Sequence, residues 1–150
     1  MTRTRISLVL AAAIGATALL AGPVPAAGLQ FRASLSGTQV VPAKGDPNGT
    51  AMITLTVSAN SRLCYVIRPK RLHLLRSAHI HRGATAATGP VTLTLFSKPR
   101  IARKGKVTGC APLTPRKLEL MAAKPASLYV DVHTKPFPKG AARGQLSTTS

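Results

Sequence analysis

The sequence predicts an all-β domain, an antiparallel β-sandwich with one short helix. Apolar and polar residues alternate in about seven short runs, as expected for strands with one buried face. Clusters of Gly, Pro and Asn separate these runs and mark turns. Residues 28–150 have the length of a single domain with its own hydrophobic core.

The first strands are predicted from strict alternation. In "LQFRASLSG" and "TAMITLTVS" every second residue is apolar, and the turn cluster "VPAKGDPNG" lies between them. The short turn "ANS" then leads into "RLCYVIR", which predicts a hairpin. In "GPVTLTLF" the same pattern directs Val91, Leu93 and Leu95 toward the core. The polar segment 97–107, "SKPRIARKGKV", is expected to be an exposed basic loop or edge.

A single helix is predicted after Thr114. Thr114 suits the N-cap, Pro115 suits the first helical position, and Pro125 ends the pattern. The runs "SLYVDVH" and "RGQLST" follow as strands. The whole order favours a β-sandwich of the immunoglobulin or superoxide-dismutase type.

Residues 1–27 are predicted to be a secretory signal peptide. Arg3 and Arg5 precede an apolar run, and small residues at Ala26 and Ala27 suit cleavage. An uncleaved membrane anchor is the alternative, but the run is shorter than the ~20 residues of a membrane-spanning helix. No other stretch is as apolar, so we expect no transmembrane segment in the mature chain and a secreted or periplasmic location.

The chain is strongly basic. Its formal net charge is +18, of which the predicted signal peptide carries two, so +16 remains beside only Asp46, Glu119 and Asp131. Such a charge favours an anionic polysaccharide or lipid surface as partner, although a solvated basic surface without a partner is equally consistent. Nucleic acid is not expected, because the chain is exported and has few aromatic residues for base stacking.

Cys64 and Cys110 are the only cysteines. An even pair in an exported chain predicts a disulfide, and two free thiols are the alternative. A metal site shared by these cysteines is disfavoured, since neither has a second Cys or a His at ligand spacing.

The motif "SAHIHRG" carries the strongest sign of chemistry. In a strand, Ile80 faces the core and His79 and His81 face outward together. The same parity in "SLYVDVHT" turns Tyr129, Asp131 and His133 outward. If the two strands are neighbours, His79, His81 and His133 form a surface cluster of the type that binds copper or zinc.

Other interpretations of the histidines stay open. The outward pair can be surface residues that only form hydrogen bonds. His73, in "KRLHLLR", has no acidic partner nearby in the sequence and is expected on the surface. No glycine-framed nucleophile, paired carboxylates or phosphate-binding loop is present, so we do not expect an enzyme of those classes.

Several motifs occur in a recognisable order: "FRASLSGTQVVP", "GTAMITLTV", "LCYVI", "AHIHRG", "GPVTLTL", "GCAP" and "LYVDVHTKPFPKGAARGQL". This order resembles that of the CHRD, or chordin-type, domain of bacterial exported proteins and of chordin. The most specific parts are the His-Ile-His-Arg-Gly block and the terminal Tyr-Val-x-Val-His-Thr followed by Arg-Gly-Gln-Leu. The resemblance covers nearly all of residues 28–150.

The resemblance implies an immunoglobulin-like β-sandwich with a distant likeness to copper/zinc superoxide dismutases, and no particular activity. The positions that match the copper ligands of dismutases are His79, His81 and His133. The loop "RGATAATGP" lacks the zinc ligands of those enzymes, which argues against dismutase chemistry. Val40 and Ala141 stand where CHRD domains usually have Glu.

Three functions follow from these observations. The first is a non-enzymatic exported module with a copper or zinc site at His79, His81 and His133. The second is a basic adhesion module that binds anionic cell-surface polymers or lipids through "KPRIARKGK". The third, a copper-only redox enzyme, is the least supported.

Overall fold

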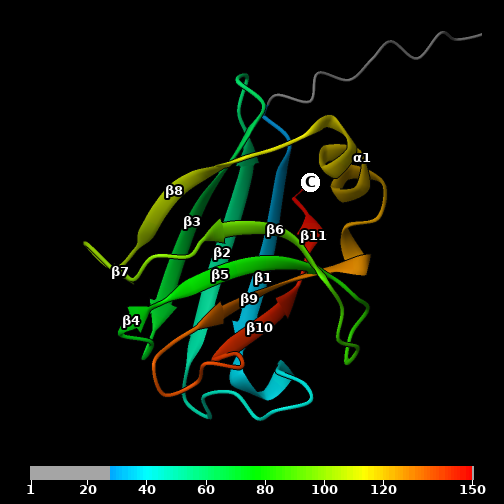
Figure 1. Ribbon diagram of the computed structural model, residues 1–150. Coiled ribbons are helices and arrows are strands. Elements are labelled where there is room, and N and C mark those ends of the chain that lie inside the picture. Colours follow the sequence, from blue (N-terminus) through cyan, green and yellow to red (C-terminus); the bar gives the residue numbers. More distant parts are fainter. Residues whose placement is uncertain (1–27, 150) are drawn as a thin grey trace, which may run out of the picture.

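The computed structural model describes residues 28–149, and the predicted signal peptide lies outside this range (Figure 1). The described chain consists mainly of short strands, with one α-helix and two short 3-10 helices. In chain order these elements are β1 (Gln30–Ser36), η1 (Gly37–Gln39), β2 (Thr50–Val57), β3 (Arg62–Lys70), β4 (Leu74–Leu75), β5 (Ser77–Arg82), β6 (Val91–Phe96), β7 (Arg100–Ile101), β8 (Val107–Pro112), α1 (Pro115–Ala123), η2 (Pro125–Ser127), β9 (Leu128–His133), β10 (Ala142–Gln145) and β11 (Ser147–Thr148).

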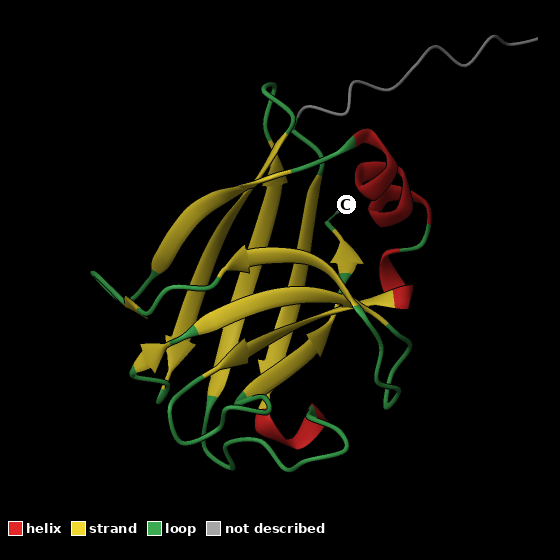
Figure 2. Ribbon diagram, in the orientation of Figure 1, coloured by secondary structure: helices red, strands yellow, loops and turns green. Residues whose placement is uncertain are grey.

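The main sheet is antiparallel and nearly closed. Its strands follow the order β6-β5-β9-β10-β1-β2-β3-β8, and β11 also pairs with β1. Figure 2 shows β5, β6, β9 and β10 crossing in front of β1, β2 and β3, and the two ends of the sheet, β6 and β8, lie in contact. The two halves of the sheet therefore face each other across one core, which confirms the predicted all-β sandwich with one short helix.

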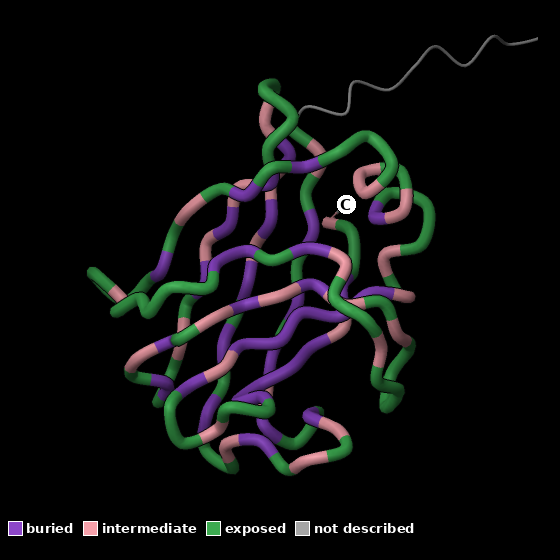
Figure 3. The backbone as a smooth tube through the Cα atoms, viewed as in Figure 1, coloured by how far each residue is buried: buried purple, intermediate pink, exposed green. Residues whose placement is uncertain are grey.

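Alternating burial along the strands builds the core. In β1, Phe31, Ala33 and Leu35 are buried and the residues between them are exposed or half-buried, and β2 follows the same pattern. Fully burying one large apolar side chain stabilises a fold by roughly 1.5–3 kcal/mol before entropy is counted. The strands β9 and β10 are buried along almost their whole length (Figure 3). Both faces of these two strands are thus covered.

The predicted helix and disulfide are confirmed. The Thr114 side chain accepts a hydrogen bond from the Lys117 amide at the start of α1, and Pro115 occupies its first turn. Cys64 and Cys110, directly opposite each other on β3 and β8, form a disulfide. Within residues 28–149, no helix has the length and apolar character required to cross a membrane.

Two details differ from the sequence prediction. Val91, predicted to face the core, is 52% exposed, because register shifts between β5 and β6 change which residues of β6 point inward. The strand β8 was not predicted, since Gly109 and Pro112 obscure its alternation. The segment 97–107 is exposed as predicted, apart from Ala102, which is half-buried, and Val107, which is buried and begins β8.

Candidate metal centre

The pairing of β5 with β9 brings the functional side chains together. Its antiparallel register is continuous and places His79 opposite Asp131 and His81 opposite Tyr129. His133 lies at the end of β9, opposite Ser77. Because side chains two residues apart share a face, His79, His81, Asp131 and His133 all project from the outer side of this half of the sheet.

The Asp131 carboxylate lies at the centre of the cluster. One carboxylate oxygen, Oδ1, is 3.1 Å from His133 Nε2 and 3.4 Å from His79 Nδ1. The other, Oδ2, is 3.1 Å from His81 Nε2. The nitrogen atoms His79 Nδ1 and His133 Nε2 are themselves 3.2 Å apart. One carboxylate and three imidazoles therefore converge on a small volume.

Main-chain carbonyls fix the orientation of two of the rings. His81 Nδ1 donates to the carbonyl of Gly89 at 2.9 Å, and His133 Nδ1 donates to that of Pro138 at 3.0 Å. A carbonyl oxygen only accepts, so Nδ1 carries the hydrogen and Nε2 of the neutral ring carries a lone pair. Both Nε2 atoms face a carboxylate that also only accepts. The centre therefore requires a positive charge, either a proton on a ring or a metal ion.

A loop over residues 83–90 covers one side of the cluster. Gly89 accepts from His81 through its carbonyl, and its amide donates to the Tyr129 hydroxyl at 3.3 Å. The Tyr129 ring stacks on His81 with 4.8 Å between ring centroids. A Cβ atom at Gly89 would overlap the carbonyl oxygen of Arg82, so only glycine fits this close approach.

Arg143 of β10 holds the same loop from the other side of Tyr129. Its guanidinium carbon lies 3.5 Å from the centre of the Tyr129 ring, and its Nη2 donates to the carbonyls of Ala84 and Ala87. Gln145 also donates to Gly83 at 2.7 Å. Arg143 is only 3% exposed. The layers His81, Tyr129 and Arg143 thus anchor the loop against the sheet.

Burial and hydrogen bonding shift the ionisation of the cluster in opposite directions. Burial alone would raise the pKa of Asp131, but hydrogen bonds from His133, His79 and His81 outweigh it and hold the pKa well below its ordinary value. Burial alone would lower the pKa values of His81 and His133. Their hydrogen bonds to Asp131 outweigh burial, so both pKa values are raised. The Asp131 carboxylate therefore favours a positive charge, a proton or a metal ion, on the neighbouring imidazole nitrogens.

The donor set fits a divalent metal ion. One ligand atom from each of His79, His81 and Asp131 lies within 4.8 Å of the other two. Two ligands about 2.1 Å from a tetrahedral ion lie about 3.4 Å apart, and the atoms of His79, His133 and Asp131 are separated by 3.1–3.4 Å. When the rings are neutral, the buried atoms His81 Nε2 and Asp131 Oδ1 lack the hydrogen bonds that protonated rings would form. A cation would satisfy both atoms.

The structure brings the three predicted histidines together and adds one residue. Strand parity placed Asp131 beside them, but the predicted ligand set did not include it. Parity also suggested a surface cluster, whereas Asp131 is only 9% exposed, because the loop 83–90 and the segment after His133 cover it. His73 is exposed as predicted and is not part of the cluster.

Fold and site together define an all-β domain that carries a buried carboxylate beneath three histidines. The chain matches the family model described as "CHRD domain" over residues 31–146, and it belongs to the CHRD domain family. No curated protein and no solved structure matches the chain.

Proposed function

We propose that this chain is an exported, non-enzymatic CHRD module that binds copper or zinc at the β5–β9 cluster. His79, His81 and Asp131 supply three ligand atoms that lie within 4.8 Å of one another, and His133 supplies the fourth side chain, 3.1 Å from Asp131. One observation carries the proposal: in both His81 and His133, Nδ1 donates to a main-chain carbonyl, which leaves the lone pair of Nε2 free to bind a metal ion. Metal-binding histidines are commonly oriented in this way by a second hydrogen bond.

The chemistry of the donors favours copper or zinc over magnesium or calcium. Imidazole nitrogen suits copper and zinc, whereas the harder ions prefer sites made of oxygen atoms. With three imidazoles and one carboxylate, the cluster offers mainly nitrogen. The rings come from adjacent strands of a sheet, so their positions are set by the backbone before any ion binds.

A binding role is supported by the positions of the three acids. Asp46 accepts from the amides of Asn48 and Gly49 within a turn, and Glu119 is exposed on α1. Neither forms an ion pair with the cluster, so the cluster holds a single carboxylate and lacks the carboxylate pair that glycoside hydrolysis requires. The disulfide agrees with a chain that folds in an oxidising compartment, as an exported protein does.

Calorimetric titration with Zn²⁺ and with Cu²⁺ tests this proposal. The unaltered protein is compared with the triple variant His79→Ala, His81→Ala and His133→Ala, and with His73→Ala as a matched control. Binding at one site per chain is expected for the unaltered protein and the control. The triple variant should lose that binding.

A spectroscopic measurement separates the cluster from adventitious sites. Cu²⁺ bound by imidazoles shows nitrogen hyperfine coupling in electron paramagnetic resonance, and this coupling should disappear only in the triple variant. If all three proteins bind with equal affinity and give the same spectrum, the metal site is elsewhere and the proposal fails.

A further inference from the structure

A second charged feature lies on the segment that leads from the end of β6 through β7 and a hairpin into β8. Its cations are all exposed: Lys98, Arg100, Arg103, Lys104 and Lys106. Arg103 and Lys106 pair across the hairpin, and the tight turn between them has positive φ at Lys104 and Gly105. The hairpin projects from the side of the sandwich away from α1 (Figure 1).

The hairpin borders a hollow of about 360 Å³ on the protein surface. Arg100, Arg103 and Lys106 contribute its charged wall, while Ile101 and Val107 contribute apolar surface. Ile101 is 71% exposed, which makes it the most exposed of the large apolar side chains in the described residues. We call this feature, defined by these five residues, the β7–β8 hollow.

The charges of the hollow are not neutralised by the protein. Within residues 28–149 the ion pairs involve only Asp131 and the histidines, so no Lys or Arg there has a carboxylate partner. The guanidinium of Arg100 lies 5.3 Å from the centre of the Phe96 ring. This cation–π contact favours one position for Arg100 before any ligand arrives.

We propose that the β7–β8 hollow binds a segment of a sulfated or carboxylated polysaccharide. Three cations around an open hollow complement the repeated negative charges of such a polymer. The exposed side chain of Ile101 offers an apolar surface on which one face of a sugar ring packs. The size of the hollow suits one or two sugar units rather than a globular partner.

The position of Ile101 favours a polysaccharide over a lipid surface. A segment that inserts into a membrane interface buries its apolar side chains in the lipid and keeps its charged side chains on the outer side. Here the tip is Lys104 and Gly105, and Ile101 lies on the wall of the hollow instead. The apolar side chain of Ile101 therefore lies among the cations of the hollow and not at the tip of the hairpin, where it would meet a membrane first.

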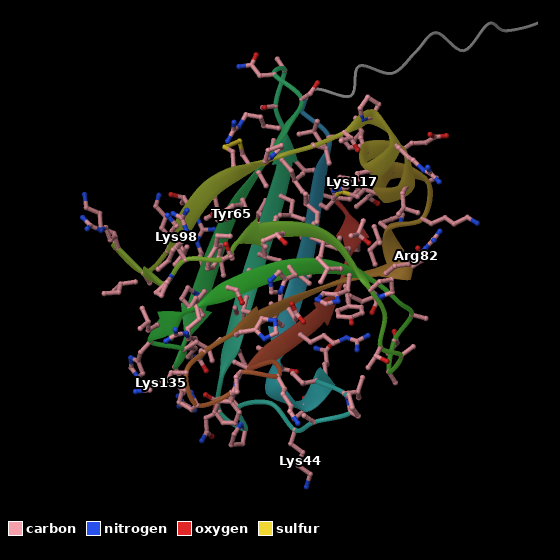
Figure 4. The ribbon with its side chains drawn as sticks, in the orientation of Figure 1. Lys44, Tyr65, Arg82, Lys98, Lys117 and Lys135 are labelled. Carbon is pink, nitrogen blue, oxygen red and sulfur yellow. A yellow bond between two sulfur atoms is a disulfide. The ribbon has the colours of Figure 1, made fainter. Side chains whose placement is uncertain are left out.

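Heparin serves as the probe, with affinity measured by calorimetry over a range of salt concentrations. The test variant is Arg100→Gln, Arg103→Gln and Lys106→Gln. The control variant removes the same charge from the opposite side of the molecule, at Arg116→Gln, Lys117→Gln and Lys124→Gln on and just after α1. Figure 4 shows Lys117 on α1 and Lys98 near β7 on opposite sides. The variants are identical outside the substituted positions, so any difference in heparin affinity arises from the substituted side chains.

The test variant should bind heparin about tenfold more weakly than the control variant, because three direct charge contacts are lost. Its affinity should also depend less on salt. The single change Ile101→Ser should weaken binding about threefold with an unchanged salt dependence, since it removes apolar contact and no charge.

Two results would overturn this proposal. Equal losses in the test and control variants would mean that heparin senses only the net charge. Tighter binding to vesicles containing 30% phosphatidylglycerol than to heparin, lost in the test variant, would assign the hairpin to a lipid surface. Neither result would affect the metal titrations, which depend on the β5–β9 cluster.

Discussion

The β5–β9 cluster and the β7–β8 hollow differ in how their charged groups are held. In the cluster, two rings are fixed by main-chain carbonyls and a single carboxylate lies beneath them. In the hollow, the cations extend from a short hairpin into solvent, and only Arg100 has an aromatic ring behind it. One region is a fixed arrangement of few charges, and the other is a dense but loosely held arrangement of many.

This difference predicts different kinds of selectivity. A fixed set of nitrogen and oxygen atoms distinguishes ions by size and geometry. Exposed cations on a hairpin distinguish ligands mainly by their charge density, and their binding weakens as salt screens it.

Removing the disulfide should lower the stability of the fold without changing the cluster. The double variant Cys64→Ser and Cys110→Ser removes a cross-link between residues 46 positions apart in the sequence. The unfolded chain gains conformational entropy, which should reduce the free energy of unfolding by about 4 kcal/mol. Urea denaturation measures this loss. Zn²⁺ affinity at temperatures where the variant is folded should match that of the unaltered protein, because β3 and β8 lie in the other half of the sheet. A weaker affinity would show that the two regions are coupled.

The variant Asp131→Asn should destabilise the metal-free protein at pH 5.5 by about 3 kcal/mol, because protonated histidines would remain partly buried without a counter-charge. Glu119→Gln removes the same charge from an exposed position and should change stability by less than about 0.5 kcal/mol. Urea denaturation of both variants gives the comparison. Similar losses for the two would mean that Asp131 acts only through the net charge.

The variant Arg143→Lys should loosen the loop 83–90. Lysine keeps the charge but lacks the planar guanidinium that donates to Ala84 and Ala87 and stacks on Tyr129. We expect a loss of about 2 kcal/mol and faster hydrogen exchange at the Gly89 amide. Arg82→Lys, at an exposed position on β5, is the control and should leave that exchange rate unchanged.

The stability of the metal-free protein and the stabilisation gained on binding metal should change with pH in opposite directions. The pKa values of His81 and His133 are raised in the fold, so their stabilising effect is complete below their ordinary pKa and is lost as pH rises through the raised values. The lowered pKa of Asp131 makes its contribution complete above the ordinary pKa of an aspartate, and that contribution is lost progressively as pH falls below it toward the lowered value. Metal competes with the ring protons, so its affinity should rise over the same interval.

Melting temperatures between pH 5 and pH 8 test this expectation. The metal-free protein should become less stable across the interval as the two histidines lose their protons. The increase in melting temperature on adding Zn²⁺ should grow over the same interval. A metal-induced increase that is independent of pH would exclude ligands that bind protons in this range.

The alternation of apolar and polar residues predicted most of the strands and the face of the sheet from which the histidines project. Alternation in β1 and β2 depends only on which face is buried, and the sequence shows this directly. The same parity turned His79 and His81 outward on one strand and His133 outward on another, and their meeting depended on those two strands being neighbours, as the pairing of β5 with β9 shows. Two features of β6 and β8 were missed, because the bulges beside β5 and the glycine in β8 interrupt the period of two.

The burial of Asp131 could not be predicted in this way. It depends on the loop 83–90 and on the segment around Pro138, which contact the cluster from different parts of the chain. The layer formed by His81, Tyr129 and Arg143 likewise joins three strand positions that no local pattern relates. The tautomers of His81 and His133 follow from those contacts and so also lie beyond the sequence pattern.

The carbonyls of Gly89 and Pro138 have a consequence for how this domain can diverge. Every residue type has a main-chain carbonyl, so control of the two imidazoles depends on the backbone path of the covering segments. Position 89 is the exception, because a Cβ atom there would overlap the carbonyl oxygen of Arg82. Substitutions in these segments are tolerated wherever the path of the backbone is kept, whereas an insertion or deletion moves the acceptor. Among relatives that keep the centre, the lengths of these segments should therefore vary less than their composition.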